Sequence, residues 1–161
     1  MPLSTADFAE IHQTLALFAH VFDNNDADAM SRVFSDDAVI EGTIGPGWTV
    51  RGIEVFREVC LNRRVDTPDH NTLNTVVFVD DDGVVRARHR YFAPLIDGGV
   101  HSGEYLDILT RTPEGWRISY RISVHRKPTL EVTLPPKSFT DAWRPRADQL
   151  LLTPESASSA H

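Results

Sequence analysis

The sequence predicts an α+β protein in which N-terminal helices pack on a strongly curved, mostly antiparallel sheet that forms a cone-shaped barrel. Two observations predict this class. Apolar residues recur at helical spacing through residues 5–64, whereas β-branched residues alternate with polar ones through residues 72–127. Helices that precede a run of strands indicate α+β architecture, and a curved sheet covered by helices leaves a conical pocket at its open end.

Three helices are expected in the first part of the chain. Residues 5–24 form the first, which Ser4 caps together with Asp7 three residues later. Asp26 caps a short second helix, and residues 53–64 form the third. The first helix buries a stripe at helical spacing, made of Phe8, Ile11, Leu15, Phe18 and Phe22. The later helices turn inward Met30, Val33 and Phe34, and then Ile53, Phe56, Val59 and Cys60.

The strands follow mainly in the second half. Residues 38–42 form a first strand, and the glycine-rich residues 43–52 form a loop. Four longer strands are then expected, joined in pairs by Asp80-Asp81-Asp82-Gly83 and Pro113-Glu114-Gly115, which are typical turn sequences. They cover residues 72–80, 83–95, 102–112 and 115–127. Residues 128–140 are expected to be extended, and a disordered tail begins near residue 153.

Length, charge and cysteine content limit the possible classes of protein. The chain has 161 residues, which predicts one domain, and a formal net charge of −7 without any run of five or more Lys or Arg. Nucleic acid and anionic membranes are therefore not expected as partners. Cys60 is the only cysteine, so no intrachain disulfide can form. No signal peptide or apolar stretch of 18 residues is seen, and we expect a cytoplasmic protein.

Asp23 is the first candidate functional residue. On a helical wheel it lies at the shoulder of the apolar stripe, beside Ala16 and Ala19, whose small side chains leave room next to the carboxylate. A carboxylate near a helix C-terminus lies against the helix dipole and is slightly unfavourable there. Asp23 is therefore either a solvated residue at the end of the helix or a group that points into a cavity.

His70 is the expected partner of Asp23, because histidine titrates near neutral pH. It stands in the segment "TPDHNT", where the chain leaves its helical half and enters the first long strand. A pocket mouth would lie at such an edge, although a loop histidine in solvent is the plainer alternative. No group of His, Cys, Asp and Glu has the spacing of a metal site, so no metal is expected.

Four segments carry a resemblance to a known family. They are "FDNNDADAMSRVFSDDAVIEG", "RGIEVFREV", "DHNTLNTVV" and "SGEYLDILTRTPEGWRISYRISVHR". Together they resemble the SnoaL-like branch of the nuclear-transport-factor-2-like superfamily, which includes scytalone dehydratase, ketosteroid isomerase, polyketide cyclases and a lindane dehydrochlorinase. The resemblance covers about residues 5–130 and implies an α+β cone. Residues 1–140 would then be a single SnoaL-like domain, and residues 141–161 a partly disordered C-terminal extension.

The resemblance also implies roles for Asp23 and His70. In the dehydratase and dehydrochlorinase branch, an Asp near the end of the first helix pairs with a His before the first long strand, and these two residues occupy those places. A carboxylate that accepts from one ring nitrogen fixes the histidine tautomer and stabilises the imidazolium. The other nitrogen can then remove and return a proton, which supports elimination of water, isomerisation or cyclisation in an apolar pocket. The expected function is that of a cofactor-free lyase or isomerase acting on a small hydrophobic carbonyl-bearing metabolite.

Further side chains are candidates for substrate binding. His89 and Tyr91 lie on the less charged side of their strand and line the pocket or bond within the sheet. Tyr105 and Arg121 resemble recurring positions of the family, and Trp48 is a possible lining residue of the loop before the third helix. Asp107 and Arg121 form a structural pair. If they instead faced the cavity with Asp23, an Asp–Arg–Asp set would indicate an epoxide hydrolase.

One departure from the family pattern leaves a second function open. The tyrosine that precedes the helical Asp in scytalone dehydratase is Phe22 here, which weakens the case for dehydration of a phenolic ketone. The alternative is a non-catalytic binding or assembly module, like the β subunit of ring-hydroxylating dioxygenases. Leu17 and Val21, on the back of the first helix, would then be contacts. On either interpretation the resemblance implies a homodimer or homotrimer.

Overall fold

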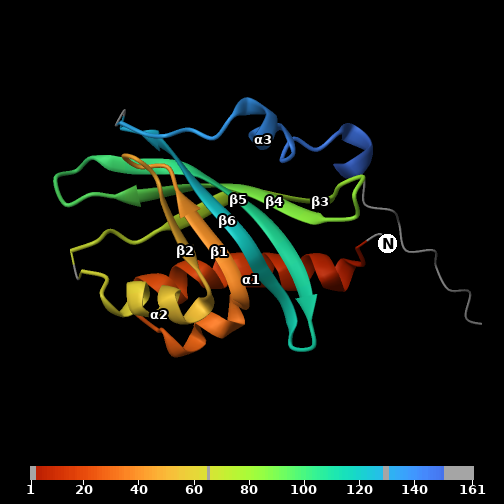
Figure 1. Ribbon diagram of the computed structural model, residues 1–161, viewed down its shortest axis with the longest axis horizontal. Helices are drawn as coiled ribbons and strands as arrows, with labels where there is room; N and C mark the ends of the chain where they lie inside the picture. Colours follow the sequence, from red (N-terminus) through yellow and green to blue (C-terminus); the bar gives the residue numbers. More distant parts are fainter. Residues whose placement is uncertain (1–2, 65, 129–130, 151–161) are drawn as a thin grey trace, which may run out of the picture.

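The computed structural model describes residues 3–64, 66–128 and 131–150. Its architecture is the predicted α+β class, a six-stranded curved sheet with helices (Figure 1). The strand order is β2-β1-β6-β5-β4-β3, so β2 and β3 are the edges and the sheet does not close into a full barrel. The helical elements are α1 (Thr5–Asp23), the 3-10 helix η1 (Asp28–Arg32), α2 (Ile53–Leu61), α3 (Lys137–Asp141) and the 3-10 helix η2 (Ala147–Leu150). The strands are β1 (Phe34–Gly42), β2 (Trp48–Arg51), β3 (Asn71–Val79), β4 (Val85–Pro94), β5 (Val100–Thr112) and β6 (Gly115–Lys127).

The sheet is mostly antiparallel, as expected, and only β1 and β6 run parallel. The prediction of a loop over residues 43–52 is wrong in part, because Trp48–Arg51 form β2 and pair with the end of β1. The glycines that suggested a loop are in the turn instead. Gly45 and Gly47 have φ values of 63° and 80°, a left-handed conformation that glycine adopts without strain. The residues that follow this turn are free to pair.

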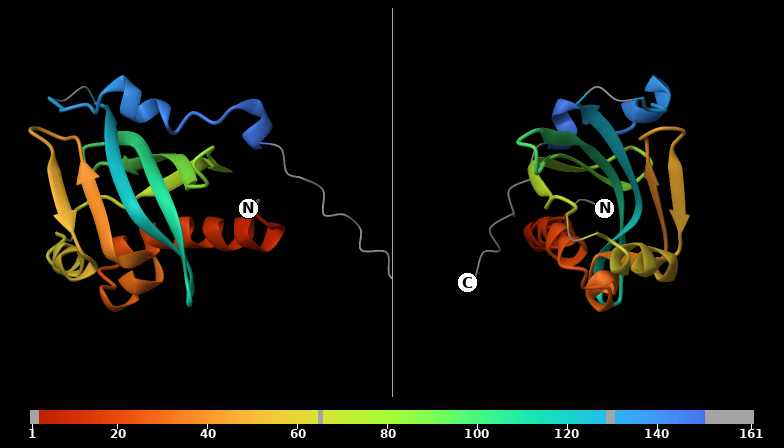
Figure 2. Two further views of the ribbon diagram at one scale, coloured as in Figure 1. Left: turned by 45° about the vertical axis from the view of Figure 1, so that its right-hand side comes forward. Right: turned by 90° about the vertical axis from the view of Figure 1, so that its left-hand side faces the viewer.

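Helix α1 lies along the concave face of the sheet (Figure 2). Ser4 and Asp7 form the predicted capping box: the Asp7 backbone N–H donates to Ser4 Oγ, and the Ser4 N–H donates to Asp7 Oδ2. The predicted stripe packs against the sheet, with Ile11, Leu15 and Phe18 at most 4% exposed. Val21 is also buried in this core, so its expected role as an external contact is wrong.

Helix α2 is shorter than predicted and ends at Leu61. Ile53, Phe56 and Cys60 are buried as expected, but Val59 is 39% exposed and belongs to the outer surface. None of the described helices is both long and apolar enough to cross a membrane.

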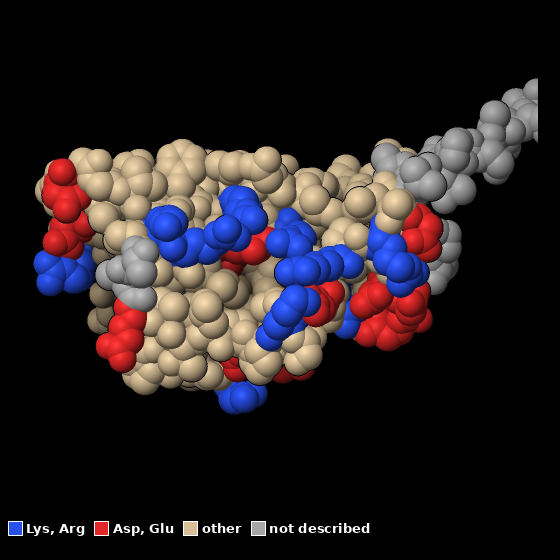
Figure 3. Space-filling view, turned by 90° about the horizontal axis from the view of Figure 1, so that it is seen from above, with Lys and Arg blue, Asp and Glu red and all other residues tan. Residues whose placement is uncertain are grey.

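The segment after β6 covers part of the convex face of the sheet. Residues 128–140 were expected to be extended, but α3 occupies the end of this range. Trp143 packs against Leu106 and Ile122, and its indole N–H donates to the Asp107 carbonyl at 2.9 Å. Arginines of β4 and β6 gather around Glu104 on the same side of the sheet, within a band of basic side chains (Figure 3). The predicted disordered tail falls outside the described residues.

Candidate active site

Asp23 lies at the C-terminal end of α1, beside Ala16 and Ala19, as its position on the helical wheel predicts. Ala16, Ala19 and His20 precede it on the same side of the helix, and together they line a hollow that lies beside β3. Asn24 ends the helix by donating its backbone N–H to the His20 carbonyl. The Asp23 carboxylate therefore faces away from the apolar stripe and towards the segment that leads into β3.

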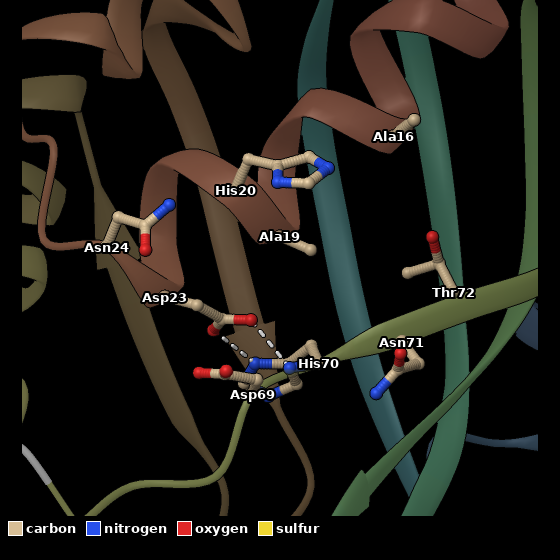
Figure 4. Close-up of a pocket in the computed structure, with 9 residues that line it drawn as sticks. All are labelled: Ala16, Ala19, His20, Asp23, Asn24, Asp69, His70, Asn71 and Thr72. Atoms are coloured by element: carbon tan, nitrogen blue, oxygen red, sulfur yellow. Dashed lines mark hydrogen bonds and ion pairs between the residues drawn. The ribbon is translucent and has the colours of Figure 1, made fainter.

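Asp23 holds His70 through both carboxylate oxygens. Its Oδ1 lies 2.8 Å from His70 Nδ1, and its Oδ2 accepts the His70 backbone N–H at 2.6 Å (Figure 4). Because an ionised carboxylate only accepts, Nδ1 carries the hydrogen, and in the neutral imidazole the lone pair is on Nε2. Within the described residues, Nε2 has no protein partner. The geometry thus fixes the orientation of a histidine that also lines the hollow.

Arg63 is a third member of this group, which the sequence did not reveal. Its Nη1 donates to the Asp23 carbonyl at 2.8 Å, and its Nη2 lies 3.1 Å from Asp23 Oδ1. Nη2 also donates to the carbonyls of Thr67 and Pro68, at 3.0 and 2.8 Å. One guanidinium therefore ties the end of α1 to the turn that presents His70. The only available signal was the position of Arg63 in the last turn of the predicted third helix, and nothing distinguished it from Arg64.

Aromatic rings surround the imidazole on the side of the core. The ring centroids of Phe18, Phe22 and Tyr91 lie 6.3, 6.0 and 6.0 Å from that of His70. Phe22, which stands where the dehydratase pattern has a tyrosine, gives the site no hydroxyl. It also stacks on Phe56 at 5.4 Å, and its role here is packing.

The hollow beside the pair has a volume of about 420 Å³, within the usual range of small-molecule sites. Its lining differs from the expected apolar pocket, because polar side chains make up most of it (Figure 4). The aromatic rings around His70 are packed into the core and do not line it. The lining residues are Ala16, Ala19, His20, Asp23, Asn24, Asp69, His70, Asn71 and Thr72.

His89 and Arg121 do not reach this hollow. They lie in the core with Asp107, whose carboxylate accepts from Arg121 Nε and Nη2, both at 2.7 Å, and lies 2.9 Å from His89 Nε2. Their side chains are at most 1% exposed. Arg121 is thus paired with Asp107, as expected for a structural pair. Asp23 has Arg63 as its arginine, so the Asp–Arg–Asp set of an epoxide hydrolase is not assembled.

Burial and charge oppose each other in this core group. Burial lowers the pKa of His89 and so favours its neutral form, although the Asp107 carboxylate acts in the opposite sense. Burial would raise the pKa of Asp107, but the charge and hydrogen bonds of Arg121 hold it below its ordinary value. The ion pair of Asp107 and Arg121 therefore persists inside the protein.

Tyr91 and Tyr105 are both buried, with ring centroids 4.5 Å apart. Burial is the main cause that raises the pKa of each phenol. The Tyr91 ring reaches past β5 because Gly103 has no side chain, and a Cβ there would collide with the Tyr91 hydroxyl. Trp48 does not line the hollow beside His70. It belongs to β2, at the opposite sheet edge from β3, where it packs over Gly42 of β1 and lines a separate hollow.

A pair of histidines that no sequence pattern predicted lies next to the Tyr91 hydroxyl. His101 Nε2 is 2.6 Å from His125 Nδ1 and 3.4 Å from the Tyr91 hydroxyl. Burial, and then the neighbouring His125 and His70, lower the pKa of His101 to about 4. In the part of the chain that the structure describes, no three His, Cys, Asp or Glu side chains are grouped to hold a metal ion.

Comparisons with known proteins agree with this geometry at the level of family and fold. Residues 4–122 match the family model described as the SnoaL-like domain. No curated protein sequence matches significantly. Among solved structures, a protein of unknown function from Mycobacterium tuberculosis is similar with a TM-score of 0.63 and 23% identity, over 77% of this chain and 74% of that one.

Two structures from Novosphingobium aromaticivorans are similar as well. One is a nuclear-transport-factor-2-like protein with a cystatin-like fold, with a TM-score of 0.61 and 21% identity over 77% of this chain and 84% of that one. The other is a candidate scytalone dehydratase, with a TM-score of 0.59 and 14% identity over 81% of this chain and 90% of that one. Identities this low establish a shared fold, and the activity has to be argued from the site.

Proposed function

Because this chain belongs to the SnoaL-like domain family, we propose that it is a lyase or isomerase that transfers a proton on a small carbonyl compound. In this proposal His70 is the base and Asp23 orients it. The observation that carries the proposal is the two-point hold of Asp23 on His70, at the wall of a hollow large enough for a small metabolite.

The reaction needs only the side chains already described. His70 Nε2 accepts a proton from a carbon next to the substrate carbonyl, and the C–H bonding electrons shift to form an enolate. The imidazolium that results is stabilised by the Asp23 carboxylate at Nδ1. The imidazolium then returns the proton. Return to a hydroxyl group on the next carbon releases water as the enolate collapses, and return to another carbon gives an isomer.

Three features of the structure support this assignment. The hydrogen bond at Nδ1 leaves Nε2, which has no partner within the described residues, as the ring nitrogen that can accept a proton. The Asp23 and His70 side chains are only 7% and 14% exposed, so water competes weakly for their contact. Arg63 also holds the turn before His70 in place, which keeps the two side chains at bonding distance.

Proton abstraction can be tested without knowing the final product. The protein is incubated in D₂O with a panel of ketones and hydroxyketones, and NMR follows exchange of hydrogens on carbons next to the carbonyl. We expect the wild-type protein to accelerate exchange for at least one member. His70→Ala should lower that rate by about 100- to 10,000-fold, the usual contribution of a positioned acid or base. Asp23→Asn should cause a smaller loss, because the base remains but its tautomer is no longer fixed.

His12→Ala is the matched control, because His12 is an exposed histidine of α1 that does not line the hollow. It should exchange hydrogens at the wild-type rate. Full activity in both His70→Ala and Asp23→Asn would refute the assignment. A wild-type protein that binds members of the panel without exchanging their hydrogens would favour a non-catalytic binding role.

A further inference from the structure

The hollow beside His70 has two walls of different character. Helix α1 supplies Ala16 and Ala19, which have no polar side-chain atoms and keep the space open, together with His20. The start of β3 supplies Asn71 and Thr72 opposite them (Figure 4). A ligand that touches His70 therefore lies between a small-residue helix face and the polar edge of the sheet.

Four of the polar residues that line this hollow have side chains without a hydrogen-bond partner in the described chain. Within the described chain, the side chains of His20, Asn24, Asn71 and Thr72 make no hydrogen bond to another protein group, in contrast to Asp23 and His70. An amide or a hydroxyl both donates and accepts, and these are the groups that proteins use to bind hydroxyl groups of ligands. These residues border one hollow, and Thr72 points across it towards α1, which gives the hollow polar groups that can bind a hydroxylated molecule (Figure 4).

The charges around the hollow disfavour an anionic ligand. Asp23 and Asp69 are both lining residues, and neither Lys nor Arg is among the lining residues described. The guanidinium of Arg63 is nearby but is occupied by main-chain carbonyls and by Asp23, and its side chain is only 6% exposed. A carboxylate or phosphate placed here would meet carboxylates without a free cation to bind it.

We infer that this hollow takes an uncharged carbonyl compound bearing hydroxyl groups, which Asn24 and Thr72 bind while the carbonyl end lies at His70. The inference rests on the proposed function for the role of His70. It proposes a polar substrate in place of the hydrophobic one expected from the sequence. It sets the specificity of the site by polarity: hydroxyl groups are favoured over plain hydrocarbon, and neutral molecules over acids.

Binding of three matched probes tests the inference. They are 4-hydroxycyclohexanone, cyclohexanone, which lacks the hydroxyl group, and 4-oxocyclohexanecarboxylate, which carries a negative charge. Their dissociation constants are measured by following backbone amide shifts of the full-length protein in NMR titrations. We expect the hydroxyketone to bind about tenfold more tightly than cyclohexanone, the value of roughly one added hydrogen bond, and the carboxylate to bind most weakly.

Variants assign the binding to this hollow. Ala19→Leu fills the space and should weaken binding of the hydroxyketone by about tenfold or more. Thr72→Val removes one hydroxyl group at nearly constant volume and should narrow the preference over cyclohexanone by about threefold. Gln13→Leu adds the same side chain to α1 at an exposed position that does not line the hollow, and should leave binding unchanged.

Three results would overturn the inference: no binding of the hydroxyketone, binding of the carboxylate at least as tight, or unchanged binding in Ala19→Leu. The binding measurement is independent of turnover. Hydroxyketone binding that survives His70→Ala, without hydrogen exchange even in the wild type, would defeat the proposed function and leave the ligand class standing. Exchange on unhydroxylated ketones alone, with equal binding of all three probes, would do the reverse.

Discussion

Two groups of the same three residue types stand in different surroundings in this protein. Asp23, His70 and Arg63 meet at the end of α1, and Asp107, His89 and Arg121 meet on the concave face of the sheet. The contacts within the groups are alike, with Asp–His distances of 2.8 and 2.9 Å. In both groups the arginine also contacts the carboxylate, at 3.1 Å from Arg63 and 2.7 Å from Arg121.

The groups differ in access and in what surrounds the arginine. The side chains of the first group are 6–14% exposed and two of them line a hollow, whereas those of the second are 0–1% exposed. Arg63 donates to main-chain carbonyls. The Arg121 guanidinium lies 4.3 Å from the ring centroids of both Phe18 and Tyr105, closer than the 5.6 Å between Arg63 and the Phe22 ring. An Asp–His–Arg combination therefore does not by itself identify a reactive site. Contact with a ligand-sized space is what separates the candidate from the core group.

The largest expected effect is on stability, in the core group. Asp107→Asn leaves the Arg121 charge buried without its anion, so the free energy of unfolding should fall by about 3–5 kcal/mol. Urea unfolding followed by circular dichroism measures the change. If the variant does not fold well enough for a full transition, the fraction of soluble folded protein at 25 °C gives the same ranking.

Asp23→Asn is the matched substitution in the first group. It should cost less, about 1–2 kcal/mol, because Arg63 keeps three main-chain carbonyl acceptors and water can reach the site from the hollow. Equal losses of stability in the two variants would show that the core group and the group at the end of α1 are energetically alike, and would remove the basis of the distinction.

Arg63 gives the next largest effect. Arg63→Ala removes the donors to Asp23, Thr67 and Pro68, and should lower the free energy of unfolding by about 2–3 kcal/mol. Arg63→Lys should recover less than half of this, because an ammonium group cannot reproduce the planar fork of the guanidinium. Hydrogen exchange measured by mass spectrometry should show faster exchange in residues 66–70 of both variants.

Arg57→Ala is the control for the loss of a cation from α2. Arg57 pairs at 3.0 Å with Glu54, which is 77% exposed, and such a surface pair contributes less than about 1 kcal/mol. If Arg57→Ala and Arg63→Ala were equally destabilised, or if exchange in residues 66–70 did not change, Arg63 would not be what holds His70 in place.

Local patterns were enough to predict much of this molecule. Helical spacing and the capping box placed α1, and turn residues placed the hairpins of β3–β4 and β5–β6. The shoulder position of Asp23 beside two alanines anticipated a space next to its carboxylate. These features depend on residues close in the sequence, or on a periodicity that tertiary contacts preserve.

Other features depend on contacts that no local pattern encodes. Arg63 bonds to carbonyl groups, which every residue has, so its partners cannot be recognised by residue type. Strand β2 was hidden because its turn glycines dominate the segment. The polar lining of the hollow arises from the approach of β3 to α1, which the pattern of each element alone does not fix. Trp143 covers the sheet from a segment with no apolar periodicity of its own.

The smallest expected effect is on the pH dependence of stability, and it comes from His101, a histidine without a carboxylate partner among the described residues. His101 lies against His125 and the Tyr91 hydroxyl, and burial, followed by the charges of His125 and His70, lowers its pKa from 6.5 to about 4. The unfolded chain therefore binds a proton at His101 before the folded protein does. Its contribution to stability is complete above pH 6.5 and is lost as the pH falls towards 4.

Urea unfolding at pH 7 and pH 5 measures this contribution. His101→Asn should lose less stability between the two pH values than the wild-type protein, by no more than about 1 kcal/mol because His101 is only partly buried. His89, whose pKa burial also lowers, titrates in both proteins and cancels from the difference. His12→Asn, at an exposed position of α1, should follow the wild type. An identical pH dependence in His101→Asn would mean that the imidazole pair opens to accept a proton.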